Sequence, residues 1–388
     1  MTETTYGWLG FALAGLLAMG CGSAEGDPAS ASGGSASWGG SASSFGGSSF
    51  GGSSFAMGGA PGTPDVKVNL EVPIASVSEF ETDAEGAVYL VLKQPTSIVK
   101  KLPDSTSPWT PLNLHGLPDS PLRFLAANDS TFYVAAYGTS DLQVHHFSAA
   151  GELLDVASAG GFYQLGGLLQ DAQSAVRISL FEGSVVTNSV VEAGQIVQGT
   201  SSAAPSVVSP SAYAFRAESG DYWAAMGSDF NGTWLTLNGK APVNVASSAT
   251  FFALAPDGAG GWYVSWSTLS TDSDTFAKTL HSSFTRYSPA GLPLWSKGWS
   301  SAPFTTAQMN GSFLTLNVIP LIDSVVFVMG LPPSDGSPMV TRYSKDGAWL
   351  GGLPPGEWVA GAGRAGDHRV VLVRQTTLEW YTFPAAAP

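Results

Sequence analysis

Short apolar runs recur along most of the chain at a nearly constant spacing. Each run holds about five residues rich in Val, Ile, Tyr, Phe or Trp and follows a turn that contains Asp, Asn or Gly. Such segments are typical of β-strands. Successive runs are separated by 44, 44, 46, 40, 63 and 45 residues and begin at Val88, Phe132, Val176, Tyr222, Trp262, Val325 and Val370. The chain is therefore predicted to repeat one structural unit of about 45 residues.

A second feature of the repeat is an aromatic residue followed by Ser, two variable residues and Gly. Clear copies stand at Phe147–Gly151, Tyr287–Gly291 and Tyr343–Gly347, and weaker ones at Ser189–Val197 and Thr236–Val243. Polar and apolar residues alternate on both sides of each copy, which predicts two antiparallel strands joined by a short turn. The glycine suits the positive φ that such a turn requires.

Units of this kind resemble the blades of bacterial β-propellers, in which the aromatic-small-x-x-Gly motif precedes an apolar strand that ends in Trp. Leu292–Trp295 is the clearest instance. The resemblance implies an all-β fold with four antiparallel strands in each blade. Seven runs predict a seven-bladed β-propeller, with six or eight blades as the alternatives. Because propellers serve binding, scaffolding and catalysis alike, the resemblance implies a fold and not an activity.

The two ends of the repeat region predict how the ring closes. Val66–Leu70 has the pattern of a strand without a hairpin partner, and the last unit ends on a third-strand pattern at Leu378–Phe383. An N-terminal strand that completes the last blade would pair both of these open edges. The propeller domain is accordingly predicted over residues 65–388.

The first 64 residues differ in composition from the rest. Gly7–Met19 is an uninterrupted apolar run of 13 residues, too short to span a bilayer as a helix but typical of a signal-peptide core. From Gly22 to Pro64, 25 of 43 residues are Gly or Ser. Such a stretch buries too little apolar surface to offset its backbone entropy. Residues 1–20 are predicted to be a signal peptide, and residues 21–64 to be a flexible tether.

The end of the apolar run, Ala18-Met19-Gly20-Cys21, resembles the lipobox of bacterial lipoproteins, although Ala18 replaces the usual Leu. In that family the chain is cleaved before the Cys, whose thiol then carries a diacylglycerol. The resemblance implies that Cys21 is lipidated and anchors the protein to a membrane of the cell envelope. Gly22 instead of Asp after the Cys implies the outer membrane. The alternative is that Cys21 is a buried free thiol behind an uncleaved apolar segment.

Charge and cysteine content exclude several classes of function. The chain has 16 Lys and Arg residues against 30 Asp and Glu, a formal charge of −14, which argues against nucleic acid as a partner. The single cysteine excludes an intramolecular disulfide and a Cys-based zinc site. The five histidines lack metal-binding spacing, and no phosphate-loop or GxSxG motif is present. We therefore predict neither a metal nor another cofactor.

The fifth unit supplies the candidate binding residues because it exceeds the period by about 18 residues, and loops longer than the fold requires often carry function. We assign the excess to loops in Ser267–Leu280 and Lys297–Ser312. These segments are predicted to form one polar and aromatic rim beside the central channel, with the candidate binding residues Asp272, Asp274, Trp299 and Phe304. The alternative is drift in a tolerant loop.

The predicted function is a non-catalytic binding or scaffold module whose partner is a protein or glycan of the envelope or the extracellular space. The alternative is an extracytoplasmic enzyme, a lyase or a glycosidase, with its site at the central channel. The lack of a catalytic motif and the small share of charged residues, 12%, favour the binding module. Two or more carboxylates together with His or Arg at the channel mouth would favour the enzyme.

Overall fold

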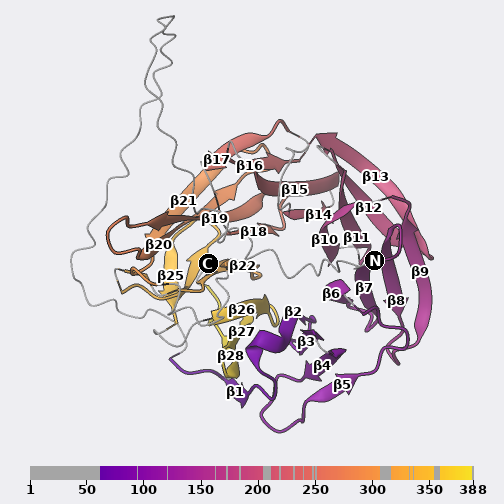
Figure 1. The fold of residues 1–388 in the computed structure, drawn as a ribbon. Helices are drawn as coiled ribbons and strands as arrows, with labels where there is room; N and C mark the ends of the chain where they lie inside the picture. The colour runs from indigo at the N-terminus through magenta and orange to yellow at the C-terminus, as the bar shows by residue number, and fades with distance from the viewer. Residues whose placement is uncertain are drawn as a thin grey trace, which may run out of the picture. The chain divides into compact units, whose positions relative to one another are not determined.

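The described part of the chain folds into seven sheets, each of four antiparallel strands (Figure 1). The computed structural model describes residues 62–386 except 94, 120, 162, 172–173, 183–184, 204–210, 218–219, 230–231, 239, 247–248, 250, 306–315, 332, 335 and 354–358. These residues include one short 3-10 helix, η1 (Ile74–Ser76), and none of their helices is long and apolar enough to cross a membrane. The prediction of an all-β, seven-bladed propeller is confirmed.

The blades are numbered 1 to 7 along the chain, and each is given from its inner strand outward. Blade 1 consists of β2 (Val77–Thr82), β3 (Val88–Lys93), β4 (Thr96–Lys101) and β5 (Thr110–Leu112). Blade 2 consists of β6 (Pro121–Ala126), β7 (Phe132–Tyr137), β8 (Leu142–Phe147) and β9 (Leu153–Ala159). Blade 3 consists of β10 (Gln164–Gln170), β11 (Val176–Glu182), β12 (Val185–Glu192) and β13 (Gln195–Ala203).

Blades 4 to 7 repeat this pattern, and each predicted apolar run lies in the second strand of a blade. They consist of β14 (Ser211–Ala217), β15 (Gly220–Asp229), β16 (Gly232–Leu237) and β17 (Val243–Ala246); β18 (Phe251–Pro256), β19 (Trp262–Thr271), β20 (Lys278–Tyr287) and β21 (Pro293–Ser300); β22 (Leu316–Pro320), β23 (Ser324–Met329), β24 (Val340–Ser344) and β25 (Trp349–Gly352); and β26 (Val359–Arg364), β27 (Arg369–Arg374), β28 (Thr377–Thr382) and β1 (Val66–Asn69).

The first strands of the blades contact one another in order around a central channel, and β26 contacts β2 to complete the ring. Strand β1 is the fourth strand of blade 7 and pairs antiparallel with β28, from Val66 opposite Trp380 to Asn69 opposite Thr377. The backbone N–H of Asp65 extends this ladder with a 2.8 Å hydrogen bond to the Trp380 carbonyl. The predicted closure of the ring by the N-terminal strand is therefore confirmed.

The aromatic-Ser-x-x-Gly motif forms the turn between the third and fourth strands of a blade, as predicted. Gly151, Gly291 and Gly347 have φ values of 87°, 76° and 84°, which an L-residue with a Cβ rarely adopts. In the blade 2 copy the Ser148 hydroxyl oxygen accepts a hydrogen bond from the Glu152 N–H at 3.2 Å. The motif is therefore a structural element of the blade.

Apolar side chains between neighbouring blades form the core. Phe124 of blade 2 packs on Tyr89 of blade 1, with ring centroids 5.4 Å apart. Phe284 of blade 5 stacks on Phe327 of blade 6 at 5.0 Å. The alternation along each strand produces this arrangement, because the two faces of a blade both pack against another blade. The core is thus divided among the blade interfaces and leaves the channel side of the inner strands open.

An ion pair between Asp and Arg recurs beside the turn between the first and second strands. In blade 5 the Asp257 Oδ1 atom accepts hydrogen bonds from the Ala259 and Gly261 N–H groups, both at 2.8 Å. Its Oδ2 atom accepts one from Arg286 Nη2 at 2.8 Å. In blade 6 Asp323 lies 2.9 Å from Arg342. Each arginine directly precedes the aromatic residue of the repeated motif, so this basic position also belongs to the repeat.

The excess of the fifth unit differs in form from the prediction of two loops. Ser267–Thr271 lies in β19 and Lys278–Leu280 in β20, so most of the first segment lengthens a hairpin of two ten-residue strands. Cross-strand hydroxyl contacts such as Ser267 Oγ to Ser282 Oγ at 2.7 Å accompany this extension. In the second segment Lys297–Ser300 lies in β21, and 306–312 lies outside the described residues. Strand structure thus continues through most of the first segment and extends to Ser300 in the second, where loops were predicted.

Candidate functional site

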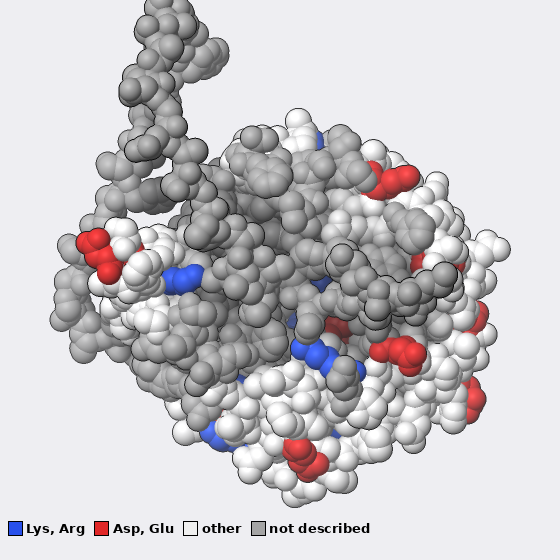
Figure 2. Space-filling model, in the orientation of Figure 1, with Lys and Arg blue, Asp and Glu red and all other residues white. Residues whose placement is uncertain are grey.

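The central channel contains a cavity of about 750 Å³. Its walls come from the inner strands of blades 1, 2, 3, 6 and 7, which are β2, β6, β10, β22 and β26. On the face drawn in Figure 2 the acidic side chains of the described residues stand apart from one another, and several basic ones lie nearer the middle. The volume is within the range of small-molecule sites.

The cavity lies at the end of the channel where the inner strands finish. Its lining continues past β2 to Asp83 and Ala84, past β6 to Asn128, and past β26 to Gly366 and Asp367. In a four-stranded antiparallel blade, the turns after the first and third strands lie at one edge, and the turn after the second strand lies at the other. The cavity is therefore on the same side as the aromatic-Ser-x-x-Gly turns.

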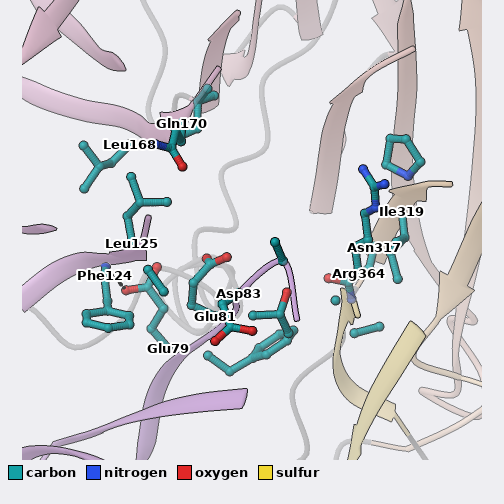
Figure 3. Close-up of a pocket in the computed structure, with 18 of the residues that line it drawn as sticks. Glu79, Glu81, Asp83, Phe124, Leu125, Leu168, Gln170, Asn317, Ile319 and Arg364 are labelled. Atoms are coloured by element: carbon teal, nitrogen blue, oxygen red, sulfur yellow. Dashed lines mark hydrogen bonds between the residues drawn. The ribbon is translucent and has the colours of Figure 1, made fainter. Parts of the chain in front are cut away.

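Two carboxylates project from one side of β2. Glu79 and Glu81 are two residues apart on the strand, and Figure 3 shows both, with Asp83, along one wall of the cavity. The intervening Phe80 and Thr82 point the other way, toward blade 7. Gly361 and Gly363 make room for them there, because a Cβ at Gly363 would lie 2.7 Å from Thr82 Cγ2. The alternation of β2 and the glycines of β26 together direct both glutamates toward blade 2 and the cavity.

Glu79 is held by the inner strand of blade 2. Its Oε2 atom accepts a 2.8 Å hydrogen bond from the Phe124 N–H, and its Oε1 atom lies 3.5 Å from Arg123 Nη1. Burial raises the pKa of Glu79 from its usual 4.5 to about 7, although the Arg123 charge and the Phe124 hydrogen bond act in the opposite direction. Glu79 is therefore partly ionised at neutral pH.

Glu81 has fewer compensating contacts. Burial raises its pKa from 4.5 to about 8, and the nearby Glu79 and Asp83 carboxylates raise it further, while the Thr82 N–H opposes this rise. Glu81 is therefore mainly protonated at neutral pH. Glu79 and Glu81 thus form a pair of carboxyl groups that both exchange protons near neutral pH.

Gln170, Arg364 and Asp83 also line the cavity, and each already has a hydrogen-bond or ion-pair partner. Gln170 accepts a hydrogen bond from the Asn128 N–H at 2.8 Å and donates one to the Ser174 carbonyl at 3.1 Å. Arg364 lies 2.7 Å from Asp367 at the end of β26. Asp83 accepts a hydrogen bond from the Ala87 N–H, in its own turn, at 2.9 Å. These groups shape the cavity rather than offering free hydrogen-bonding atoms.

The structure brings the two predicted segments of blade 5 together. The N–H of Lys278 donates to the Phe304 carbonyl at 2.7 Å, and the Phe304 N–H donates to the Lys278 carbonyl at 2.8 Å. The turn after β19 and the connection after β21 lie at the blade edge opposite to the first turn. The predicted rim and the cavity are therefore at opposite ends of the channel.

The four candidate binding residues of these segments differ in accessibility. Phe304 is buried with Leu280 and Leu331, and Trp299 stacks on Phe327 at 4.7 Å, so both aromatic side chains contribute to packing. Asp272 and Asp274 are exposed in the turn between β19 and β20. Asp272 accepts hydrogen bonds from the Asp274 N–H at 3.0 Å and the Thr275 N–H at 2.8 Å. Cys21 lies outside the described residues.

Glu79 and Glu81 are not among the residues predicted from the sequence. The signal was the segment Glu79-Phe80-Glu81-Thr82-Asp83, in which two acidic residues alternate with others in a strand just before an Asp turn. Alternation alone does not tell which face of an inner strand meets the channel. Within the described residues, no group of three or more His, Cys, Asp and Glu side chains is placed to hold a metal ion.

Comparison with known proteins identifies the fold alone. No protein-family model and no curated protein sequence matches the chain. Among solved structures, it is similar to virginiamycin B lyase from Staphylococcus aureus, with a TM-score of 0.50 and 10% identity over 82% of this chain and 99% of that one. A streptogramin B lyase gives 0.49 and 11% over 82% and 97%. YCF48 bound to D1 peptide gives 0.43 and 12% over 84% and 100%. These neighbours include a lyase and a propeller that binds a peptide.

Proposed function

We propose that this propeller is an extracytoplasmic enzyme that cleaves a C–O bond of a small polar substrate by acid–base catalysis in its central cavity. The carrying observation is that Glu79 and Glu81 share one wall of the cavity, where burial raises the pKa of both carboxyl groups. With Arg123 beside them they meet the criterion that favours an enzyme over a binding module. Perturbed carboxylates in a cavity are a frequent mark of an active site.

The two carboxyl groups have different roles in this reaction. Glu81, protonated at neutral pH, donates its proton to the leaving oxygen as the C–O bond breaks. Glu79, as the carboxylate stabilised by Phe124 and Arg123, accepts a proton. In hydrolysis this proton comes from the attacking water, and in elimination it comes from the carbon next to the one that loses the oxygen. Exchange with solvent then returns both groups to their starting states.

The test is a panel of oligosaccharides incubated with the purified full chain. New reducing ends indicate hydrolysis, and ultraviolet absorption by an unsaturated product indicates elimination. Glu81→Gln and Glu79→Gln should each lower turnover by about a hundredfold or more. Glu152→Gln is the matched control, because Glu152 is exposed on blade 2 outside the cavity, and it should retain full turnover. Equal turnover in all four proteins, or no cleavage by the unaltered chain, would contradict the proposal.

The site of action proposed for this enzyme is the cell envelope. The apolar run and Ala18-Met19-Gly20-Cys21 support lipidation of Cys21 and attachment to the outer membrane. The Gly- and Ser-rich segment that follows supports display of the propeller at some distance from the membrane. This arrangement matches a substrate of extracytoplasmic origin.

A second candidate function, docking of an envelope or extracellular protein or glycan, is favoured by the turn between β19 and β20. Phe276 is 74% exposed in this turn, in a left-handed conformation with φ of 56°, close to the exposed Asp272 and Asp274. An exposed aromatic side chain offers a partner a large apolar contact area. Replacing residues 270–279 by a short turn and repeating a capture of partners from envelope extract tests it. Recovery of the same partners in equal yield would contradict this function.

A further inference from the structure

One amide group in the cavity is buried without a hydrogen bond. Asn317 lies on β22 and lines the cavity, and its Nδ2 atom has no hydrogen-bond partner within the described part of the chain. Buried donors are seldom left unsatisfied, because each one costs the desolvation of its N–H groups. Figure 3 places Asn317 across the cavity from Glu79 and Glu81. The Nδ2 atom is covered by protein in the ligand-free cavity, so a rotation of the Asn317 side chain would present it to a ligand oxygen between these walls.

The charged groups of the cavity restrict the net charge of a ligand that could bind there. Among the described lining residues the cations are Arg123 and Arg364, and each lies beside a carboxylate, Glu79 and Asp367 respectively. An anionic substrate would therefore meet an acidic wall without a cation of its own. A cationic substrate would favour ionised glutamates and remove the proton that catalysis requires. The cavity thus favours a substrate without net charge.

The cavity lining also contains apolar side chains. Leu125, Leu168 and Ile319 lie around the cavity between the polar groups (Figure 3). Sugars present C–H faces to apolar side chains and hydroxyl groups to amides and carboxyl groups, which are the groups found here. We infer that the substrate is a neutral, hydroxyl-rich glycan and that the Asn317 amide donates a hydrogen bond to one of its oxygens. This inference rests on the proposed function and adds the substrate class and a specificity-determining residue.

Binding to the full chain carrying Glu81→Gln tests the inference independently of turnover. The probes are size-matched tetrasaccharides: neutral ones (cellotetraose, maltotetraose and xylotetraose), an anionic one (tetragalacturonate) and a cationic one (a chitosan tetramer). At least one neutral probe should bind at least about tenfold more tightly than both charged ones, by calorimetry. Asn317→Leu, which keeps the volume but removes the donor, should weaken that binding about tenfold. Asn113→Ala, at an exposed position outside the cavity, is the control and should leave binding unchanged.

The outcomes separate this inference from the proposed function. Tighter binding of tetragalacturonate or of the chitosan tetramer, or equal affinity in the Asn317→Leu variant, would overturn the inference. Cleavage of tetragalacturonate by the unaltered chain would overturn the inference and keep the enzyme. A neutral probe that binds through Asn317 and is not cleaved would overturn the enzyme and keep the ligand class. Unfolding curves of the variants exclude a trivial loss of structure.

Discussion

Lys67 on the first strand lies 2.7 Å from Glu379 on the last strand of the ring, and this contact joins residues more than 300 positions apart in the chain. Glu379 is buried and also contacts Arg374 and Tyr381. Hydrogen bonds from Lys67, Arg374 and Tyr381 lower the pKa of Glu379 despite its burial. The strand that closes the ring is thus held by a backbone ladder and by a charge network within blade 7.

Deleting residues 66–70 should lower the stability of the full chain strongly, because β28 would lose its partner and expose a row of backbone hydrogen-bonding groups. Lys67→Ala is the matched control. The Lys67 side chain is 57% exposed, so its removal should cost within about 1 kcal/mol. Thermal unfolding compares the three proteins, and equal midpoints for the deletion and the unaltered chain would mean that the ring closes without β1.

Replacing Arg286 by Leu should destabilise the protein by about 3–5 kcal/mol, because it leaves the Asp257 carboxylate buried and unpaired. Asp257 has a side chain only 1% exposed, and Arg286 also donates to the Lys345 carbonyl of the next blade at 2.7 Å. Denaturant unfolding measures the loss, and adding Asp257→Asn should restore part of it. Arg364→Leu breaks an exposed ion pair and serves as the control, with an expected change below about 1 kcal/mol.

Gly361→Ala should lower the free energy of unfolding by about 1–3 kcal/mol. The new Cβ, at the interface between blades 1 and 7, would overlap the Phe80 ring. The displacement of Phe80 should also shift Glu79 and Glu81 and lower turnover. Gly160→Ala places its Cβ in open space and should change neither property. Unfolding midpoints and turnover of both variants give the comparison, and a neutral Gly361→Ala would disprove the role assigned to this glycine.

Stability of the ligand-free protein should fall between about pH 5 and 9 more steeply than in the Glu79→Gln, Glu81→Gln double variant. Both pKa values are raised above 4.5 in the folded state, to about 7 and about 8. The folded protein then holds more protons than the unfolded chain in this range. Their stabilising contribution is therefore complete at low pH and lost as the pH rises through the folded values.

The difference between the two stability curves is the measured quantity, because other titrating groups cancel in it. Parallel curves would show that the two glutamates have ordinary pKa values. For the same reason the pH profile of turnover should rise through about 7, as Glu79 ionises, and fall through about 8, as Glu81 loses its proton. An activity that keeps rising above this range would contradict Glu81 as the acid.

Intact-mass measurement of detergent-extracted protein should show that residues 1–20 are missing and that Cys21 carries acyl chains. The reason is the sequence of an apolar run, small residues and the single cysteine of the chain. Cys21→Ser should abolish the acyl mass and release the protein from the membrane fraction. An unmodified Cys21 in a protein that fractionates without membranes would refute the anchor.

Local pattern was enough to predict the blades. Apolar runs after Asp or Gly turns mark the second strands, and the aromatic-Ser-x-x-Gly motif marks the last hairpin of a blade, because alternation and positive φ act within a few residues. The unpaired strand patterns at Val66–Leu70 and Leu378–Phe383 were likewise enough to predict that the two ends of the repeat region meet. These features depend on residues that are close together in the sequence and on the need to pair every strand edge.

Only the tertiary structure determined which side chains are buried and which carboxyl groups have shifted pKa values. Glu79 and Glu81 acquire shifted pKa values because β2 is an inner strand, and Gly361 and Gly363 on a distant strand leave room for Phe80 and Thr82 to pack toward blade 7. Phe304, predicted to belong to a binding rim, is buried because Leu280 and Leu331 from other segments pack with it. Burial, desolvation and the side of the channel that a residue faces arise from contacts between blades, and one chain segment does not contain that information.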